Sequence, residues 1–380
     1  MQRLLKLLCL IAFANDALAD SQDTAVELSY EGMSQSSSGA KGINDAYWHF
    51  WNLKSASNSQ LQSSNWLWSL ELSGQAGLAP MSEGQYAVGT AKPGVKVVGQ
   101  RYTHHVELNG TSSYDSTGLE RRPLVEQWDN QRLSPDDRKH YLYGSVSSDH
   151  YVSLTHRSSV IAYFIASSLD RGSSIFEAYY GDLDFEYELD ARTKFRLGAI
   201  QQRYISNLID IATGGPKATM IYELTPTTNI EVKAGVLVFE SESGPSETGT
   251  AGLTVANYDV DSSWRLSWQR GVTRPVGSLV VTVSDVLAAT SKMMFVPGHS
   301  LEANFERRDE SWVQGFEGRK PASNTSASLR YVIEPVSDPS DGDKPVGWKL
   351  NFGVNGEYIQ LKDGEDAQRQ VVRLSAERSF

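Results

Sequence analysis

Histidine and serine are the residue types in this chain that could bind a metal or act as base and nucleophile. His104 and His105 are adjacent, and adjacent residues of a strand point to opposite faces, so they are poorly placed to chelate one ion. His156 lies two residues before Ser158, and Ser300 follows His299 directly, but both pairs fall at predicted turns. The chain has no phosphate-binding loop, glycine-rich nucleotide motif or metal-ligand spacing. We therefore predict no enzyme activity, no metal site and no cofactor.

Charged side chains at alternate positions are stronger functional candidates. Glu186 and Glu188 alternate with apolar residues before a short polar turn, and Lys194 and Arg196 do so after it. Such charges are costly against lipid and inexpensive against water, so we expect them to line a wet interior. The predicted lumen-lining residues are Glu186, Glu188, Lys194, Arg196, Glu223, Glu231, Lys233, Asp259, Arg265, Glu302, Glu306, Lys349, Glu357 and Arg373.

Two functions of this polar face are open. It could form a conduit or a saccharide-binding lumen, and Tyr141, Tyr143 and Tyr179 would then be candidates for stacking on sugar rings. Alternatively, opposite charges could simply pair across strands inside a plugged barrel.

A recurring hairpin positions these charges. Its copies begin at Val152, Tyr187, Tyr222 and Tyr258, which are 35, 35 and 36 residues apart. Each copy combines an alternating strand end, a small polar turn and an alternating strand start. The strands are long enough for a tilted transmembrane strand, which needs about 9–11 residues.

The same alternation along the chain predicts an all-β protein, a single antiparallel transmembrane β-barrel of about 18 strands, with 16 as the alternative. A soluble β-sandwich is the competing fold, although so many long strands would be unusual for it. The expected strands are 24–33, 45–55, 65–75, 84–91, 95–109, 140–154, 159–169, 175–189, 194–206, 216–224, 229–241, 249–260, 264–273, 278–295, 300–310, 322–334, 347–361 and 367–380.

Connection lengths predict an orientation in the outer membrane of a Gram-negative bacterium. Periplasmic turns of such barrels are short and external loops are longer. An even strand count then places both termini in the periplasm. One long connection, 334–346, falls among the short turns, which are 92–94, 155–158, 190–193, 225–228, 261–263 and 296–299.

Residues 1–19 are typical of a secretory signal peptide, with a positive start, an apolar core and a small-residue motif ending at Ala19. We expect the barrel to occupy residues 20–380. The single cysteine, Cys9, lies inside the signal, so a disulfide framework is excluded. The net charge of −11 argues against nucleic-acid binding. Outer-membrane lipid is the expected partner of apolar positions such as Phe195 and Leu197.

The recurring pattern Tyr-x-Leu-Ser/Thr/Asp-Pro/Ala-x-Thr, the strand 264–270, the turn 275–277 and the terminal Phe380 resemble a known family. They resemble the outer-membrane β-barrel porins of exopolysaccharide export loci, including the exosortase-associated (PEP-CTERM) group, over about residues 140–380. This resemblance implies export of extracellular polysaccharide, with polysaccharide and other export-machinery proteins as partners. The alternatives are a general porin for small solutes and a plugged structural barrel.

Residues 110–139 form a long polar stretch on the predicted outer side. Long connections in compact folds are usually functional or disordered. This one carries many charges together with Leu119, Leu124, Val125, Trp128 and Leu133, which could pack it into the barrel mouth. We predict that it gates or constricts the mouth; the alternative is a mobile surface loop.

Overall fold

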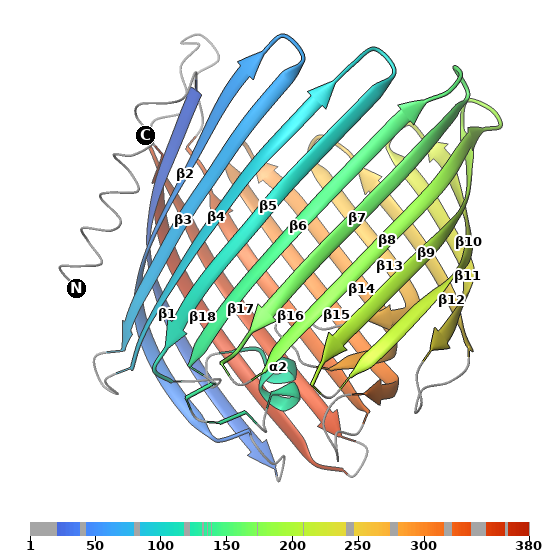
Figure 1. The fold of residues 1–380 in the computed structure, drawn as a ribbon. Coiled ribbons are helices and arrows are strands. Elements are labelled where there is room, and N and C mark those ends of the chain that lie inside the picture. The colour runs from blue at the N-terminus through green and yellow to red at the C-terminus, as the bar shows by residue number, and fades with distance from the viewer. Residues whose placement is uncertain are drawn as a thin grey trace.

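The computed structural model describes residues 21–38, 43–79, 84–117, 122–130, 133–134, 136–137, 139–172, 174–207, 209–240, 247–273, 280–314, 321–335, 347–361 and 364–379. These residues form 18 antiparallel strands that close into a barrel, since β1 pairs with both β2 and β18 (Figure 1). The predicted barrel of 18 strands is therefore confirmed, and the 16-stranded barrel and the sandwich are excluded. The predicted signal peptide and Phe380 lie outside the described residues.

Each strand pairs with its neighbours in sequence, and the strand bounds follow in chain order. They are β1 (Ser21–Ser38), β2 (Ala46–Ser63), β3 (Trp66–Ala79), β4 (Gly84–Val98), β5 (Tyr102–Asp115), β6 (His140–Ser153), β7 (Ser158–Asp170), β8 (Ile175–Glu188), β9 (Thr193–Ser206), β10 (Asp210–Thr225), β11 (Thr228–Glu240), β12 (Glu247–Tyr258), β13 (Ser262–Thr273), β14 (Val281–Val296), β15 (His299–Gln314), β16 (Ala322–Ile333), β17 (Trp348–Leu361) and β18 (Asp366–Ser379).

Alternation along the strands gives the barrel an apolar outer face and a polar inner face. In β8, Leu183 and Phe185 are 54% and 44% exposed, whereas Asp184 and Glu186 are 8% and 7% exposed. Side chains of successive strand residues point to opposite faces, so a closed barrel must put one set outside. An apolar outer face of this kind is suited to lipid rather than to water.

Aromatic side chains gather on the outer face toward the end with the short turns. Trp66, Tyr102, Tyr187, Trp264 and Trp348 are all exposed there and lie within a few residues of a turn. Tyrosine and tryptophan prefer the boundary between hydrocarbon and water, where the ring is sheltered and the polar atom is wet. This aromatic belt therefore marks one edge of the apolar band.

The two ends of the barrel differ in their connections. Short turns join β2 to β3, β6 to β7, β8 to β9, β10 to β11, β12 to β13 and β14 to β15, and they lie at the upper end in Figure 1. β1 begins and β18 ends at this same end. The opposite end, which we call the α2 end, carries the connection that contains the helix α2 (Leu124–Asp129). The long connection between β16 and β17 is an exception to the pattern, because it lies at the end with the short turns.

The first predicted turn is misplaced. A turn was expected at 92–94, but β4 continues to Val98 and the turn occupies 99–101. Pro93 pairs with Leu70 of β3 without interruption, and pairing with β5 lapses only at Lys92 and Pro93. Proline removes one N–H donor, and the strand tolerates that loss because its other edge remains paired. β5 extends to Asp115, into the stretch expected to be loop, because it pairs with β4 as far as Tyr86.

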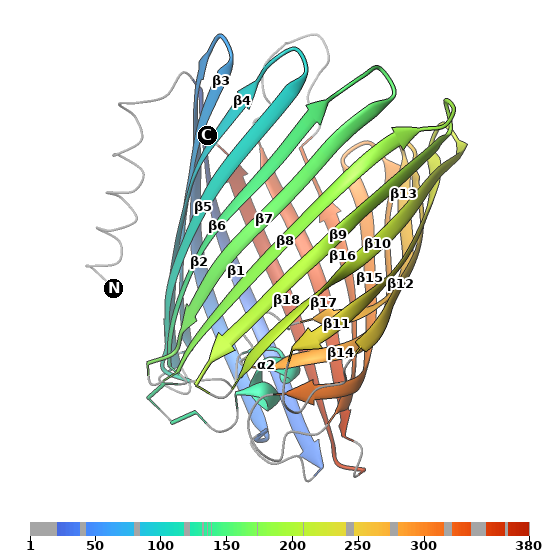
Figure 2. The ribbon, with the colours of Figure 1, turned by 45° about the vertical axis from the view of Figure 1, so that its right-hand side comes forward.

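The α2 end is packed from within. The apolar side of α2 lies against the inner faces of β17 and β18, where Leu124 and Trp128 are buried with Ile359 and Ala367 (Figure 2). A second buried cluster follows the inner wall from Leu169 and Phe176 to Phe239, and the start of β14 joins it. Within the described residues no helix is long and apolar enough to cross a membrane.

The start of β14 stays paired with β13 and β15 but is buried more deeply than the rest of the strand. Val281, Thr282, Val283 and Ser284 are each 0–2% exposed, so this segment is covered on both faces, unlike the rest of the strand. A bulge between Val283 and Ser284 shifts its register against β15. A bulge bends a strand and increases its local twist. The bent segment therefore narrows the same end of the barrel that holds α2.

Candidate functional site

Most of the charged residues proposed for the lumen lie on the inner face. Asp259 is the exception: it lies in the turn after β12, where its Oδ1 accepts a 2.7 Å hydrogen bond from the Val260 N–H. β12 ends at Tyr258, two residues earlier than expected, which leaves Asp259 outside the wall. The residues on the inner face alternate with exposed apolar neighbours; they are Glu186, Glu188, Lys194, Arg196, Glu223, Glu231, Lys233, Arg265, Glu302, Glu306, Lys349, Glu357 and Arg373.

Ion pairs connect many of these inner-face charges across or along the strands. The Glu186–Arg196 pair is 2.7 Å long, the Glu188–Lys194 pair 3.0 Å and the Arg373–Glu27 pair 2.7 Å. Arg330 contacts Glu302 on the neighbouring strand. Further pairs are Lys233–Glu231, Lys349–Glu334, Arg308–Glu306 and Arg369–Glu357. The inner wall therefore presents paired charges of both signs rather than a field of one sign.

A network of four inner-face residues, Lys217, Asp182, Asp184 and Tyr180, was missing from the residues predicted to line the lumen. The Lys217 Nζ lies 2.6 Å from a carboxylate oxygen of Asp182 and 2.9 Å from Asp184 Oδ2. The hydroxyl of Tyr180 donates to Asp182 at 3.0 Å. Asp182 and Asp184 alternate with Leu183 and Phe185, so the same period-two pattern would have identified them.

The segment around α2 crosses the α2 end and is attached to several parts of the wall. The Leu124 N–H donates to Glu357 Oε2 of β17 at 2.9 Å, and the Gln127 amide exchanges hydrogen bonds with Gln35 of β1. On its other side, Glu126 forms an ion pair with Arg171, which follows β7. These attachments hold α2 inside the barrel mouth.

Arg171 is unusual because its guanidinium is fully buried. Its relative exposure is 0%, and it lies 5.1 Å from the ring centre of Tyr141. Burial lowers the pKa of Arg171, and the adjacent Glu126 carboxylate opposes that change. Arginine remains protonated in proteins, so the pair stays charged. Arg122 also lies close to the two residues that Arg171 contacts. Its Nε is 4.0 Å from a carboxylate oxygen of Glu126, and its guanidinium carbon is 5.5 Å from the ring centre of Tyr141.

Two cavities open onto the lumen. One of about 620 Å³ lies between β1, β3–β5 and β15–β18, and its wall includes Arg122, Glu302, Arg330, Glu357 and Arg369. Another of about 550 Å³ lies against β5–β9 and is lined mainly by tyrosines. The expected Tyr141 and Tyr143 are on the inner face, but Tyr179 points outward, since it shares the face of Leu183 and not that of Asp182.

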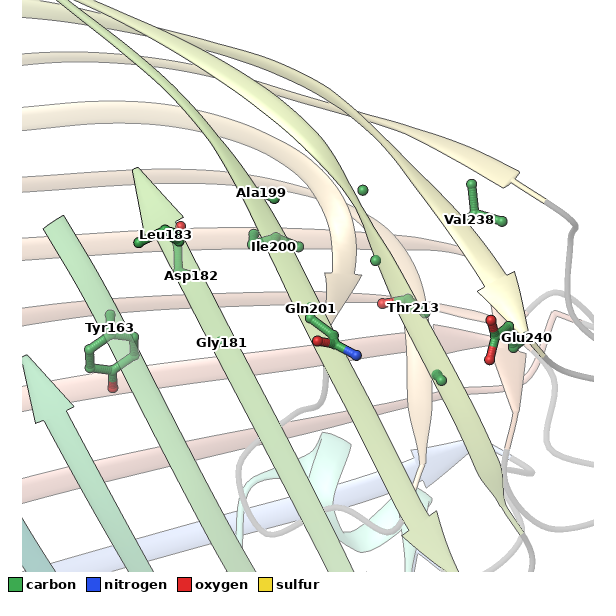
Figure 3. Close-up of a pocket in the computed structure, with 13 residues that line it drawn as sticks. Tyr163, Gly181, Asp182, Leu183, Ala199, Ile200, Gln201, Thr213, Val238 and Glu240 are labelled. Carbon is green, nitrogen blue, oxygen red and sulfur yellow. The ribbon is translucent and has the colours of Figure 1, made fainter. Parts of the chain in front are cut away.

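Figure 3 shows a different hollow, of about 590 Å³, across β7–β11. Its lining comes from both sides of the wall: Tyr163 and Asp182 belong to the inner face, and Leu183 and Val238 to the outer face. Several glycines leave the wall thin there, including Gly181. This hollow is a feature of the wall and not a single binding site.

The histidines do not form a metal centre. His104 and His150 face outward with their Nδ1 atoms 2.8 Å apart, whereas His105 faces inward and lies 3.6 Å from Asp149. The opposite directions of His104 and His105 follow from their adjacency in β5. Among the described residues, no group of three or more His, Cys, Asp or Glu is arranged to hold a metal ion.

Comparison with known proteins gives a match in fold. No protein-family model matches the chain, and no curated protein sequence is similar to it. The outer-membrane protein OpdK of Pseudomonas aeruginosa is a structural match at 11% identity, covering 96% of this chain and 100% of that one, with a TM-score of 0.52. OpdK solved with vanillate matches at 10% identity, the same coverage and 0.52. OccK11 (OpdR) of the same organism matches at 10% identity, 95% and 97% coverage, and 0.50. The chain thus has the closed 18-stranded barrel architecture of these outer-membrane proteins.

Proposed function

We propose that this protein is an outer-membrane channel for small polar solutes. The observation that carries the proposal is a closed barrel whose outer face is apolar and whose inner face carries paired charges and cavities. A water-filled path is the environment in which so many inward charges are least costly. Its likeness in fold to the outer-membrane protein OpdK supports the same assignment.

The proposed orientation puts the short turns and both strand termini in the periplasm and the α2 end outside. Short periplasmic turns and long external loops are general in bacterial barrels. Residues 1–19 would be removed as a signal peptide and 20–380 would remain as the barrel. The α2 segment then narrows the external mouth, which restricts passage to small solutes.

Export of polysaccharide is the second candidate, and the hairpin resemblance to export-locus barrels favours it. The attachments of α2 to β1, β17 and Arg171 count against it, because a polymer would need that segment to move aside. Both functions would place the barrel in contact with outer-membrane lipid. Only polysaccharide export would also require export-machinery proteins as partners.

Conductance in planar lipid bilayers tests the proposal. Purified, refolded barrel should give discrete current steps that grow with salt concentration. A variant in which 118–137 is replaced by a short Gly/Ser linker should fold and conduct more. A correctly folded barrel that passes no current in either form would identify a plugged structural barrel, and a channel role would be rejected.

A further inference from the structure

Tyrosines concentrate on one part of the inner wall. Tyr141 and Tyr143 of β6, Tyr163 of β7, Tyr180 of β8 and Tyr204 of β9 all line the cavity of about 550 Å³, and we call them the tyrosine wall. Volumes of roughly 300–1,000 Å³ are usual for small-molecule sites. Four adjacent strands thus contribute aromatic rings to one concave surface.

The geometry of the tyrosine wall leaves room for a flat ligand. Tyr141 and Tyr143 stack with their ring centres 6.4 Å apart, and Tyr163 and Tyr180 are 5.7 Å apart. The cavity surface beside these pairs includes the aliphatic Ile165 and the small residues Ser167 and Ala178, whose side chains are shorter than the tyrosine rings around them. A ring-shaped solute can therefore lie on the floor with tyrosine faces beside it.

Polar groups at the edge of the cavity are neutral. Asn109 and Thr111 of β5 line it, and among the described lining residues none is charged. The nearest guanidiniums, Arg122 and Arg171, lie over the Tyr141 ring and interact with Glu126. Asp149 lies directly across from Tyr163 in the strand register. A carboxylate ligand would thus meet no available cation here and would lie near an acid.

We propose that the tyrosine wall is a binding subsite for a neutral sugar ring within the channel, a proposal that rests on the channel function above. The apolar face of a pyranose stacks on aromatic rings, while its hydroxyls need amide and hydroxyl partners of the kind that Asn109, Thr111 and Ser167 supply. Tyrosine combines a large apolar ring face with a hydroxyl that can hydrogen-bond at its edge. The neutral surroundings select against aromatic acids.

Maltotriose, a neutral oligosaccharide, is a suitable probe in single-channel recordings, with benzoate as the anionic comparison. We expect maltotriose to interrupt the current reversibly and benzoate at the same concentration to leave it unchanged. Replacing two rings, in the double variant Tyr143→Leu and Tyr163→Leu, should weaken the maltotriose effect about tenfold. Tyr187→Leu, on the outer face of β8 and outside the cavity lining, is the matched control and should bind like the unmodified barrel.

Calorimetric titration of detergent-folded barrel with maltotriose measures binding even in a barrel that does not conduct. Binding that is lost only in the double variant supports the subsite whether or not current is seen. Conductance without maltotriose binding would overturn the subsite and leave the channel function intact. Block by benzoate, weakened by the double variant, would also overturn it in favour of an anion site. Heat-modifiable gel mobility confirms that each variant is folded.

Discussion

Lys217 and Asp184 form a 2.9 Å ion pair although their strands, β10 and β8, are separated by β9. The residue between them in the register is Gly198, which pairs with Asp184 on one side and with Lys217 on the other. Because glycine has no side chain, the lysine can extend across β9 to the carboxylate. A single glycine thus allows the charge network to span three strands of the inner wall.

Replacing Gly198 with alanine should destabilise the barrel. The new Cβ would lie 2.1 Å from both the Leu183 carbonyl oxygen and Asp184 Oδ1. Relieving such overlap costs typically about 1–3 kcal/mol. We expect a lower midpoint of urea unfolding, followed by tryptophan fluorescence. Gly181→Ala, where the added Cβ meets nothing within 4 Å, is the control. Equal midpoints for the two variants would contradict this account.

The outer face should reject a charge that the inner face accepts. Leu266 is exposed on the outer face between Trp264 and Trp268, and the next residue, Ser267, faces the lumen. Leu266→Arg places a guanidinium against lipid, at a cost that reaches about 2–4 kcal/mol at the bilayer midplane and is smaller at the depth of Leu266, closer to the aromatic belt. Ser267→Arg should fold into lipid vesicles with much smaller loss. Folding yield by heat-modifiable mobility distinguishes them, and equal yields would argue against a lipid-facing surface.

Removing the Arg171 charge should release α2 from the mouth. Arg171→Met leaves Glu126 buried without its main partner, and breaking such a pair typically costs about 3–5 kcal/mol. We expect higher single-channel conductance with the barrel still folded. Glu126→Gln combined with Arg171→Met removes the stranded charge and should restore part of the closure. If the folded Arg171→Met variant conducts like the unmodified barrel, the Glu126–Arg171 ion pair does not hold α2 in the mouth of the channel.

The turn after β8 should contribute stability that depends on pH. The backbone N–H of Arg192 and the hydroxyl of Thr193 donate to Asp190 and hold its pKa below the ordinary value. A depressed carboxyl pKa stabilises the fold above the unfolded pKa, near 4, and this contribution disappears as pH falls through the lower folded value. Asp190→Ala should therefore lower the urea midpoint at pH 7 but not well below pH 3. A pH-independent difference would assign the effect to another cause.

The alternating pattern was enough to predict the barrel, the 18 strands and the inward direction of residues such as Glu186 and Arg196, because period two is a local property of each strand. The same alternation also predicts that Asp182 and Lys217 face the lumen. The early turn was misplaced at Pro93 because proline usually ends strands, and here it sits within one.

Long-range partners were beyond what the sequence could show. Glu126 and Arg171 are 45 residues apart, and nothing in either local pattern selects one for the other. The apolar character of Leu124 and Trp128 did indicate that the loop packs inward, but not against which strands. The bend at the start of β14 lies opposite a bulge at Ser311 of β15, whose hydroxyl donates to the Val283 carbonyl.

The position of α2 has a consequence for the order of assembly. Its partners Gln35 and Glu357 lie on β1 and β17, on either side of the seam where β18 meets β1. Across that seam Arg373 pairs with Glu27, 346 residues earlier in the chain. Contacts of such separation form late, because closing long loops is entropically costly. The helix can therefore dock fully only after β1 and β18 have paired. Once docked, it stabilises the β18–β1 seam, which forms last.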